Sequence, residues 1–138
     1  MSQATRRIGI DAGHRVTRHE SKCRHVHGHR YEVEITVEGE LDHAGRVLDF
    51  GCLKDVVGGW LMDSMDHGYI AAPWDEVADQ LEASGFKVYR MPDGMEPTAE
   101  NIASHVMVQA RILLADRGIR VTHVRVYETP SCWADCVG

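Results

Sequence analysis

The chain has 138 residues, which is enough for one compact domain with a hydrophobic core and too few for two, so we expect a single domain over residues 1–138. Hydrophobic residues make up 43% of it and charged residues 26%, which excludes an intrinsically disordered chain. The formal net charge of −6 argues against a general nucleic-acid-binding surface.

The compartment is predicted from what the sequence lacks. Its first residues, "MSQATRRIGIDAGH", contain no apolar leader, and no run reaches the roughly 18 apolar residues that a membrane span needs. We therefore expect a cytoplasmic protein without a membrane partner. In a reducing compartment the four cysteines are predicted to be thiols or metal ligands and not disulfides.

Alternation and helical spacing predict the elements of the first half of the chain. The even positions of residues 7–14 share one side of a short strand. Apolar and polar residues alternate over 31–38, and "GELDHAG" turns into "RVLDF", so residues 30–50 are predicted to form an antiparallel hairpin. Apolar residues at helical spacing over 53–65 predict a helix.

The second half opens with a segment that looks like an insertion, from about residue 72 to 96. It contains a short helix and the brief strand "FKVYRM". Thr98 is a good N-cap for a long helix that ends before Gly118. The final strand, "VTHVRVYE", alternates and places Glu128 on the same face as its buried valines.

This order of elements predicts the fold class. Strand, hairpin, helix, insertion, helix and strand suggest an antiparallel sheet with helices gathered on one face, which is an α+β architecture. Such a small sheet leaves open edges, so we expect the chain to pair with copies of itself.

Histidines gather around the start of the second strand. The stretch "CRHVHGH" contains a cysteine and three histidines, and His27 and His29 point to the same side as the buried positions of that strand. His14 has inward parity in the preceding strand. Three histidines suit zinc and leave its fourth position open. The alternative is a solvated strand end with His14 as a core histidine, and His25 is a rival ligand of the same parity.

Two further groups could take part in chemistry. Cys23 could be a fourth ligand that closes the site, or a free thiol beside the metal that acts as a base. Asp66 and His67 follow the first helix, where a carboxylate can orient an imidazole and raise its basicity, although such pairs are also common on ordinary surfaces.

A carboxylate on a buried strand face needs hydrogen-bond donors or a cation as partners. Glu128 could accept from a ligand with paired N–H groups, or it could form a salt bridge with an arginine such as Arg125 on a neighbouring strand or chain. In the tail, Cys132 and Cys136 could form a second metal site, but packing or exposed thiols explain them more simply.

Taken together, the motifs resemble the 6-pyruvoyltetrahydropterin synthase family, and more closely its bacterial branch, the 6-carboxytetrahydropterin synthases of queuosine biosynthesis. The resemblance rests on "DAGHR", "CRHVHGH", "LDF", "MDHGY", "PTAEN" and "YET", in that order along nearly the whole chain. It implies the T-fold, in which a four-stranded antiparallel sheet carries two long helices. It also implies trimers that stack into a homohexamer with active sites at subunit interfaces.

The resemblance implies a role for each site residue. The zinc ligands would be His14, His27 and His29. Proton transfer would use the base Cys23 together with Asp66 and His67. Glu128 would anchor the pterin ring, and Thr98 would help to bind it.

The implied reaction is that of a zinc-dependent lyase acting on a small molecule. It converts 7,8-dihydroneopterin triphosphate to 6-carboxy-5,6,7,8-tetrahydropterin, with release of acetaldehyde and triphosphate. The three-residue gap between Cys23 and "HGH" favours this product over the pyruvoyl product. The basic residues that could meet the triphosphate are Arg15, Arg18, Lys22 and Arg24.

Other functions stay open at this stage. The chain could be a 6-pyruvoyltetrahydropterin synthase or could shorten the side chain to 6-hydroxymethylpterin. It could also be a small binding module in which Cys23 closes a structural zinc site. The insertion and the short tail after Glu128 are departures from the family pattern that could reshape the pocket.

Overall fold

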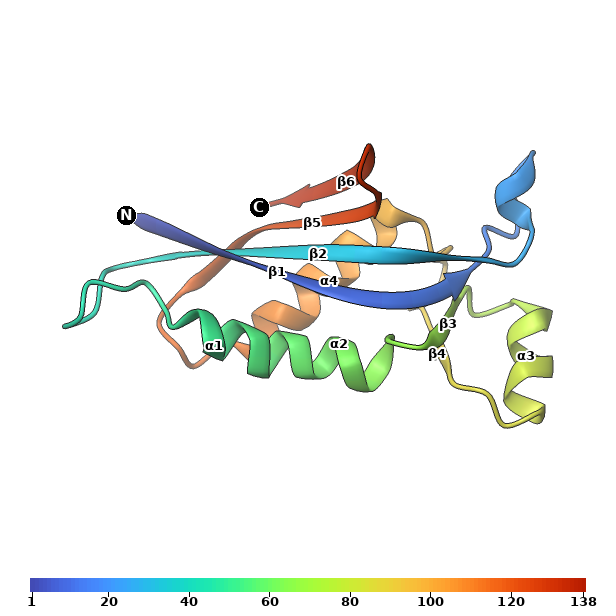
Figure 1. The fold of residues 1–138 in the computed structure, drawn as a ribbon, viewed down its shortest axis with the longest axis horizontal. Helices are drawn as coiled ribbons and strands as arrows, with labels where there is room; N and C mark the ends of the chain where they lie inside the picture. The colour runs from blue at the N-terminus through green and yellow to red at the C-terminus, as the bar shows by residue number, and fades with distance from the viewer.

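A computed structural model describes all residues, 1–138, and contains one six-stranded sheet with helices packed against it (Figure 1). The strands are β1 Ser2–His14, β2 His27–Gly39, β3 Gly68–Ala71, β4 Val88–Arg90, β5 Arg120–Thr129 and β6 Cys132–Val137. The helices are α1 Phe50–Leu53, α2 Gly59–Ser64, α3 Glu76–Ala83 and α4 Ala99–Leu113, with a π-helical turn at Lys54–Gly58 and a 3-10 turn at Lys22–Arg24.

The sheet has more strands than predicted and is not wholly antiparallel. Its order is β4-β3-β1-β2-β5-β6, and β3 pairs in parallel with both β1 and β4. All four residues of β3 are buried, so that strand shows no alternation in the sequence. The expectation of four antiparallel strands holds only for β1, β2, β5 and β6.

The predicted hairpin over residues 30–50 is wrong. The partners of β2 are β1 and β5, and β1 runs antiparallel to β2 along its full length, from Ser2 opposite Gly39 to His14 opposite His27. The stretch "RVLD" is not a strand. Instead, Asp49 caps the helix that follows, because its side chain accepts a hydrogen bond from the Gly51 N–H at 2.8 Å.

The two main helical segments are confirmed. The predicted helix over residues 53–65 corresponds to one run, Phe50–Ser64, that passes through the π-helical turn and has Met65 as its C-cap. Thr98 is the N-cap of α4, where its hydroxyl accepts from the Asn101 N–H at 3.1 Å. After α4, Gly118 has a φ of 68°, the left-handed conformation that favours glycine.

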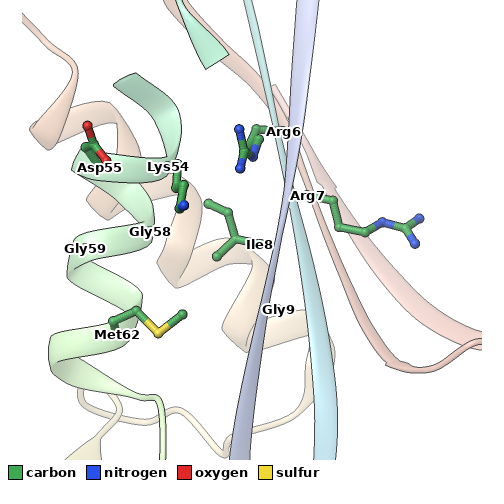
Figure 2. A pocket seen from close by; sticks show the side chains of 9 residues that line it. All are labelled: Arg6, Arg7, Ile8, Gly9, Lys54, Asp55, Gly58, Gly59 and Met62. Atoms are coloured by element: carbon green, nitrogen blue, oxygen red, sulfur yellow. The ribbon is translucent and has the colours of Figure 1, made fainter. Parts of the chain in front are cut away.

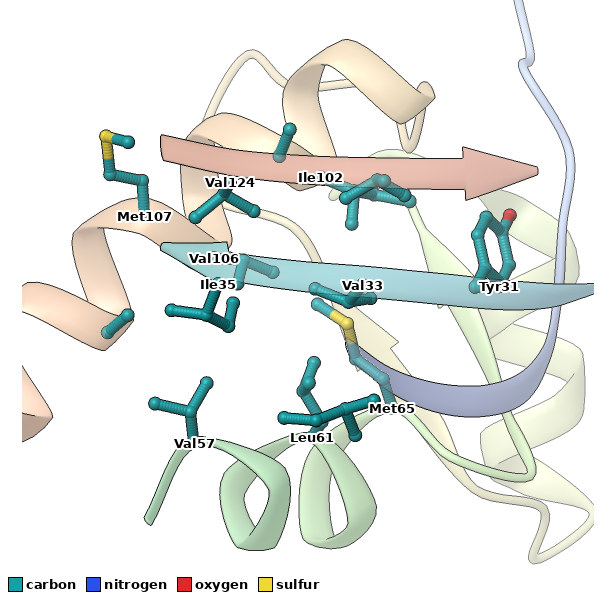
Figure 3. Close-up of a cluster of buried hydrophobic side chains, with 14 of the residues drawn as sticks. Tyr31, Val33, Ile35, Val57, Leu61, Met65, Ile102, Val106, Met107 and Val124 are labelled. Atoms are coloured by element: carbon teal, nitrogen blue, oxygen red, sulfur yellow. The ribbon is translucent and has the colours of Figure 1, made fainter. Parts of the chain in front are cut away.

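The hydrophobic core lies between the sheet and these helices. Figure 3 shows Val33 and Ile35 of β2 facing Val57 and Leu61 of the first helical run, and the same cluster includes Val106 of α4. The predicted gathering of helices on one face is therefore confirmed, and α3 packs separately beside β4 (Figure 1). None of the helices is both long and apolar enough to cross a membrane.

Three stretches of sheet edge have no strand beside them, and one is the outer side of β4. β3 pairs with β1 only from Ala12 to His14, so the preceding residues of β1 are open on that side. β6 is the last strand at the opposite end of the sheet. Unpaired N–H and C=O groups on both edges could pair with another chain.

Candidate functional site

Three histidines meet where β1 ends and β2 begins. The register places His14 opposite His27 and Ala12 opposite His29, so all three rings lie on the helix-covered face. The ring centroids are 4.6 to 5.1 Å apart, and one ring nitrogen from each histidine lies within 4.8 Å of the others. The predicted juxtaposition is therefore present, and the cluster includes neither His25 nor Cys23.

Backbone carbonyl groups orient two of these rings. His14 Nδ1 lies 2.7 Å from the Pro97 carbonyl oxygen, and His27 Nδ1 lies 2.7 Å from that of His25. A carbonyl oxygen only accepts, so each Nδ1 carries the proton and each Nε2 keeps its lone pair. The Nε2 atoms of His14 and His29 are buried and have no hydrogen-bond partner. Buried polar atoms are rarely left in that state unless a ligand satisfies them.

The electrostatic environment favours the neutral imidazoles of His14 and His29. Burial lowers the pKa of His14 from 6.5 to about 4, and the neighbouring His27 and His29 add to the effect, against the Pro97 hydrogen bond. Burial also lowers the pKa of His29, although the Glu128 carboxylate opposes it. Neutral imidazole is the form that binds a metal.

Glu128 lies beside the histidine cluster. Its Oε2 is 3.8 Å from His29 Nε2, which is too far for a hydrogen bond. Both residues are among those that line a cavity of about 800 Å³, whose other lining residues include Arg30, Tyr127 and Trp133. Within the chain Arg125 does not pair with Glu128, because it binds Asp135 at 2.7 Å, and a salt bridge from Glu128 to an arginine of a neighbouring chain stays an alternative.

Tyr31 is a site residue that the sequence did not single out. Its side chain is 1% exposed, its ring contacts those of His14 and His29, and its hydroxyl has no hydrogen-bond partner. Burial raises the pKa of this hydroxyl, and the charge of Glu128 raises it further. A neutral tyrosine therefore presents an unused donor beside the cluster. Alternation predicted only that the residue points inward.

Asp66 and His67 form the predicted carboxylate–imidazole pair. Asp66 Oδ2 lies 2.7 Å from His67 Nδ1, and its Oδ1 accepts from the Asp11 N–H at 2.9 Å. Burial alone would raise the pKa of Asp66, but the hydrogen bonds from Asp11 and His67 outweigh it, so that the pKa is lowered. The side chain of His67 is 77% exposed and lines a shallow hollow together with His29. The pair therefore opens towards the same end of the sheet.

Cys23 sits in the loop of residues 15–26, which joins β1 to β2. It belongs to the 3-10 turn Lys22–Arg24, and its thiol is free and partly buried. The loop therefore carries the cysteine between two strands that each end in a histidine of the cluster.

The four basic residues of this loop differ in their partners. Arg15 binds the buried Asp75 at 2.9 Å, and Arg18 pairs with Glu96 at 3.4 Å. Lys22 and Arg24 form no ion pair within the chain. These two are free to meet an anionic ligand, whereas the charges of the first two are already compensated. The partners Asp75 and Glu96 were not recognised in the sequence.

Thr98 lies where α4 approaches this site. Its hydroxyl caps the helix, and the next residues, Ala99 and Glu100, line a small cavity of about 210 Å³ with Glu128. The predicted contact of Thr98 with a pterin remains a prediction.

A second groove lies away from these residues. It has a volume of about 390 Å³ between β1 and the π-helical turn, and Figure 2 shows Arg6, Ile8 and Lys54 among its lining residues. It contains none of the predicted site residues.

The chain matches the family described as 6-pyruvoyl tetrahydropterin synthase over residues 3–138, and it belongs to that family. It is 40% identical over 139 residues to the 6-carboxy-5,6,7,8-tetrahydropterin synthase of Rickettsia bellii, in an alignment that covers 98% of this chain and 99% of the other. Because nearly all of both chains align, residues 72–96 have a counterpart in that relative, so the supposed insertion does not set this chain apart from it.

Solved structures agree on the fold. An uncharacterised protein from Wolinella succinogenes superposes with a TM-score of 0.87 at 22% identity, covering 99% of this chain and 98% of the other. The 6-pyruvoyl tetrahydropterin synthase of Caenorhabditis elegans superposes with a TM-score of 0.74 at 21% identity, covering 99% and 95%. The fold is therefore the predicted T-fold.

Proposed function

We propose that this chain is a zinc-dependent 6-carboxy-5,6,7,8-tetrahydropterin synthase. It would convert 7,8-dihydroneopterin triphosphate to 6-carboxy-5,6,7,8-tetrahydropterin with release of acetaldehyde and triphosphate. The observation that carries the proposal is the three-histidine cluster, two of whose nitrogens are buried without partners, beside Glu128. The identity with the Rickettsia bellii synthase supports the choice of product.

The donor set fits zinc. Three imidazoles, those of His14, His27 and His29, are the kind of ligand set that catalytic zinc sites use, and two of them are oriented by carbonyl oxygens. When bound, zinc supplies a Lewis acid that acidifies the protons of a hydroxylated side chain. With Cys23 outside the cluster, the protein supplies three ligands and the fourth position is left for the substrate.

Glu128 gives the site its selectivity for a pterin. A pterin ring presents an amino group next to a ring N–H, and one carboxylate can accept from both. The cavity of about 800 Å³ that Glu128 and His29 share is large enough for such a ring. Ring binding at Glu128 directs the side chain of the substrate towards the histidines. Lys22 and Arg24 are the residues we assign to the triphosphate.

Cys23, Asp66 and His67 move the protons. Asp66 accepts from His67 Nδ1, which leaves Nε2 of this exposed ring free to take or return a proton. Cys23, in the loop between the ligand-bearing strands, acts as the base towards the substrate side chain. The reaction releases triphosphate, protonates the ring and cleaves one carbon–carbon bond. It consumes one water molecule, so that the atoms of substrate and products balance.

Assembly would complete the site. The open part of β1 and the outer edge of β6 are suited to pairing between copies of the chain, and the exposure of His67 leaves room for a neighbour. We propose a homohexamer built as a dimer of trimers, in the cytoplasm, whose product feeds queuosine biosynthesis.

Product analysis tests the proposal. Zinc-loaded protein and its Cys23→Ala variant are incubated with 7,8-dihydroneopterin triphosphate, and the products are identified by mass spectrometry. Formation of 6-carboxytetrahydropterin and acetaldehyde by the parent protein alone is the expected result. A pyruvoyl product from the parent would overturn the choice of branch, and no turnover would overturn the synthase assignment.

A further inference from the structure

We propose that two buried carboxylates, those of Asp75 and Glu96, are positioning residues that hold the Cys23 loop, residues 15–26, in its working conformation. The inference rests on the role of Cys23 given under Proposed function, and it assigns a function to the segment over 72–96. Neither carboxylate belongs to the histidine cluster or to the Asp66–His67 pair.

Glu96 binds the first part of the Cys23 loop through its backbone. Its carboxylate accepts from the Thr17 N–H at 2.9 Å and the Arg18 N–H at 2.8 Å, and also from the Thr17 hydroxyl at 2.9 Å. The side chain of Glu96 is only 9% exposed. Two successive loop residues are thus fixed by one carboxylate that comes from a different part of the chain.

The residue after Glu96 holds a histidine of the cluster. The Pro97 carbonyl oxygen accepts from His14 Nδ1 at 2.7 Å, and the Asn101 side chain donates to the Glu96 carbonyl oxygen at 3.0 Å. Glu96 and Pro97 therefore join the first turn of α4 to His14 and to the Cys23 loop. Any movement of Glu96 relative to His14 is limited by this short connection.

Asp75 reaches the far part of the same loop through Arg15. Its buried carboxylate accepts from Arg15 Nε at 3.1 Å and Nη2 at 2.9 Å, and from the Tyr69 hydroxyl at 2.7 Å. Arg15 Nη1 then donates to the carbonyl oxygen of Arg24 at 3.4 Å, next to Cys23. This path crosses the loop from its first residue to the turn that carries the thiol.

Trp74 adds a third contact from the same segment. Its Nε1 donates to the Thr17 hydroxyl at 2.9 Å, and the Arg18 guanidinium lies 4.4 Å from the centre of its ring. The loop thus meets a polar and aromatic surface made by residues 74–96.

The Cys23 loop has little structure of its own to replace these contacts. Its 3-10 turn, Lys22–Arg24, has no buried residue and no side-chain cap. Val16 N donates to the Cys23 carbonyl oxygen at 2.8 Å and His19 N to that of Val16 at 3.0 Å. A connection of this length without a core is mobile unless other elements hold it. Misplacement of a catalytic group by about 1 Å can lower a rate by about 100-fold.

The experiment compares Glu96→Gln and Thr17→Val with Glu82→Gln. Glutamine is isosteric, but its NH2 group faces donors that it cannot accept from. Thr17→Val removes only the hydroxyl contact with Glu96 from the loop side and keeps the two backbone N–H bonds. Glu82 is a matched control, because it lies in the same segment and pairs only with Arg90. The readouts are amide hydrogen exchange of residues 16–24, the iodoacetamide alkylation rate of the Cys23 peptide, zinc content, kcat and KM.

For Glu96→Gln we expect exchange in the loop to rise at least about tenfold and Cys23 alkylation about fivefold, and for Thr17→Val we expect smaller rises in both, because its backbone N–H still donates to Glu96. For Glu96→Gln we expect kcat to fall about 10- to 100-fold with KM within about threefold and zinc content unchanged. A merely structural role would lower stability without this selective loss of kcat.

Exchange and alkylation equal to those of Glu82→Gln in both variants would overturn the proposal. Thr17→Val keeps the test decisive if Glu96→Gln fails to fold, because it leaves the segment over 72–96 intact. If the zinc-loaded parent protein does not turn over the pterin, the proposed function fails, while exchange and alkylation still decide whether the carboxylates hold the loop.

Discussion

The inner face of β1 and β2 differs in chemistry between the middle of the strands and the end where the histidines lie. Towards the middle of the strands, Ile8 lies opposite Val33, and both belong with Ile35 to the hydrophobic core cluster. At the end of this face the same alternation places histidines, whose buried nitrogens have no partner. Burial stabilises the first region, whereas in the second it leaves polar atoms unsatisfied, at a cost of about 1–3 kcal/mol each. The unsatisfied buried nitrogens therefore distinguish the candidate functional site from the hydrophobic core.

The largest expected effect is on metal binding at the histidine end. His29→Leu removes one of three ligands, and we expect zinc affinity to fall roughly 1,000-fold, about a third of the binding free energy of a zinc site. Because leucine removes an unpartnered buried nitrogen, the zinc-free variant should be at least as stable as the parent. Zinc titration and urea unfolding measure the two quantities. A zinc-free variant that is much less stable would place His29 in the core.

The apolar region should respond in the opposite way. Ile35 is fully buried, and we expect Ile35→Ala to lower the free energy of unfolding by about 2–5 kcal/mol through lost burial and a cavity. Zinc affinity of the folded variant should not change. Ile112, which is 64% exposed, is the control, and Ile112→Ala should lower stability by less than about 0.5 kcal/mol. Equal losses in urea unfolding would contradict this reading of the core.

The zinc-free protein should lose stability as the pH falls. Burial holds the pKa of His14 at about 4 when folded, below its ordinary value of 6.5, so the unfolded chain takes up the proton first. The contribution of His14 to the free energy of unfolding is fully present above pH 6.5. It is lost as the pH falls from about 6.5 to about 4, by about 3 kcal/mol at most. Urea unfolding across the window measures the slope. His14→Gln should remove most of it, and an unchanged slope in that variant would exclude His14 as its source.

The smallest effect concerns two buried tyrosines. Tyr31→Phe removes a hydroxyl without a partner and should leave stability unchanged or raise it by about 1 kcal/mol. Tyr69→Phe is the matched control, because its hydroxyl donates to Asp75 at 2.7 Å, and it should lower stability by about 1–2 kcal/mol. Urea unfolding of the two zinc-free variants compares them. Equal losses would show that the Tyr31 hydroxyl is satisfied in solution.

Local periodicity explains which parts of this site were predictable. A period of two places His27 and His29 on one face, and the N-cap signal of Thr98 and the position of Gly118 delimit α4. Each of these depends on neighbours within a few residues. The three-histidine cluster followed once β1 and β2 were taken as neighbours.

Contacts between distant segments were not predictable in this way. The carbonyl group that orients His14 is 83 residues away, and the Thr17–Glu96 contact spans 79 residues. β3 was missed because complete burial removes alternation. The "LDF" stretch fits both the end of a strand and the start of a helix. The sequence therefore predicts a strand there, whereas in the structure Asp49 is the N-cap of a helix.

Zinc analysis of three purified proteins tests the central claim most directly. The parent protein and Cys23→Ala should each hold about one zinc per chain, and His29→Leu should hold almost none, because zinc is bound by the histidines alone. Loss of zinc from Cys23→Ala would indicate a closed, four-ligand structural site. Zinc retained by His29→Leu would contradict the three-histidine centre itself.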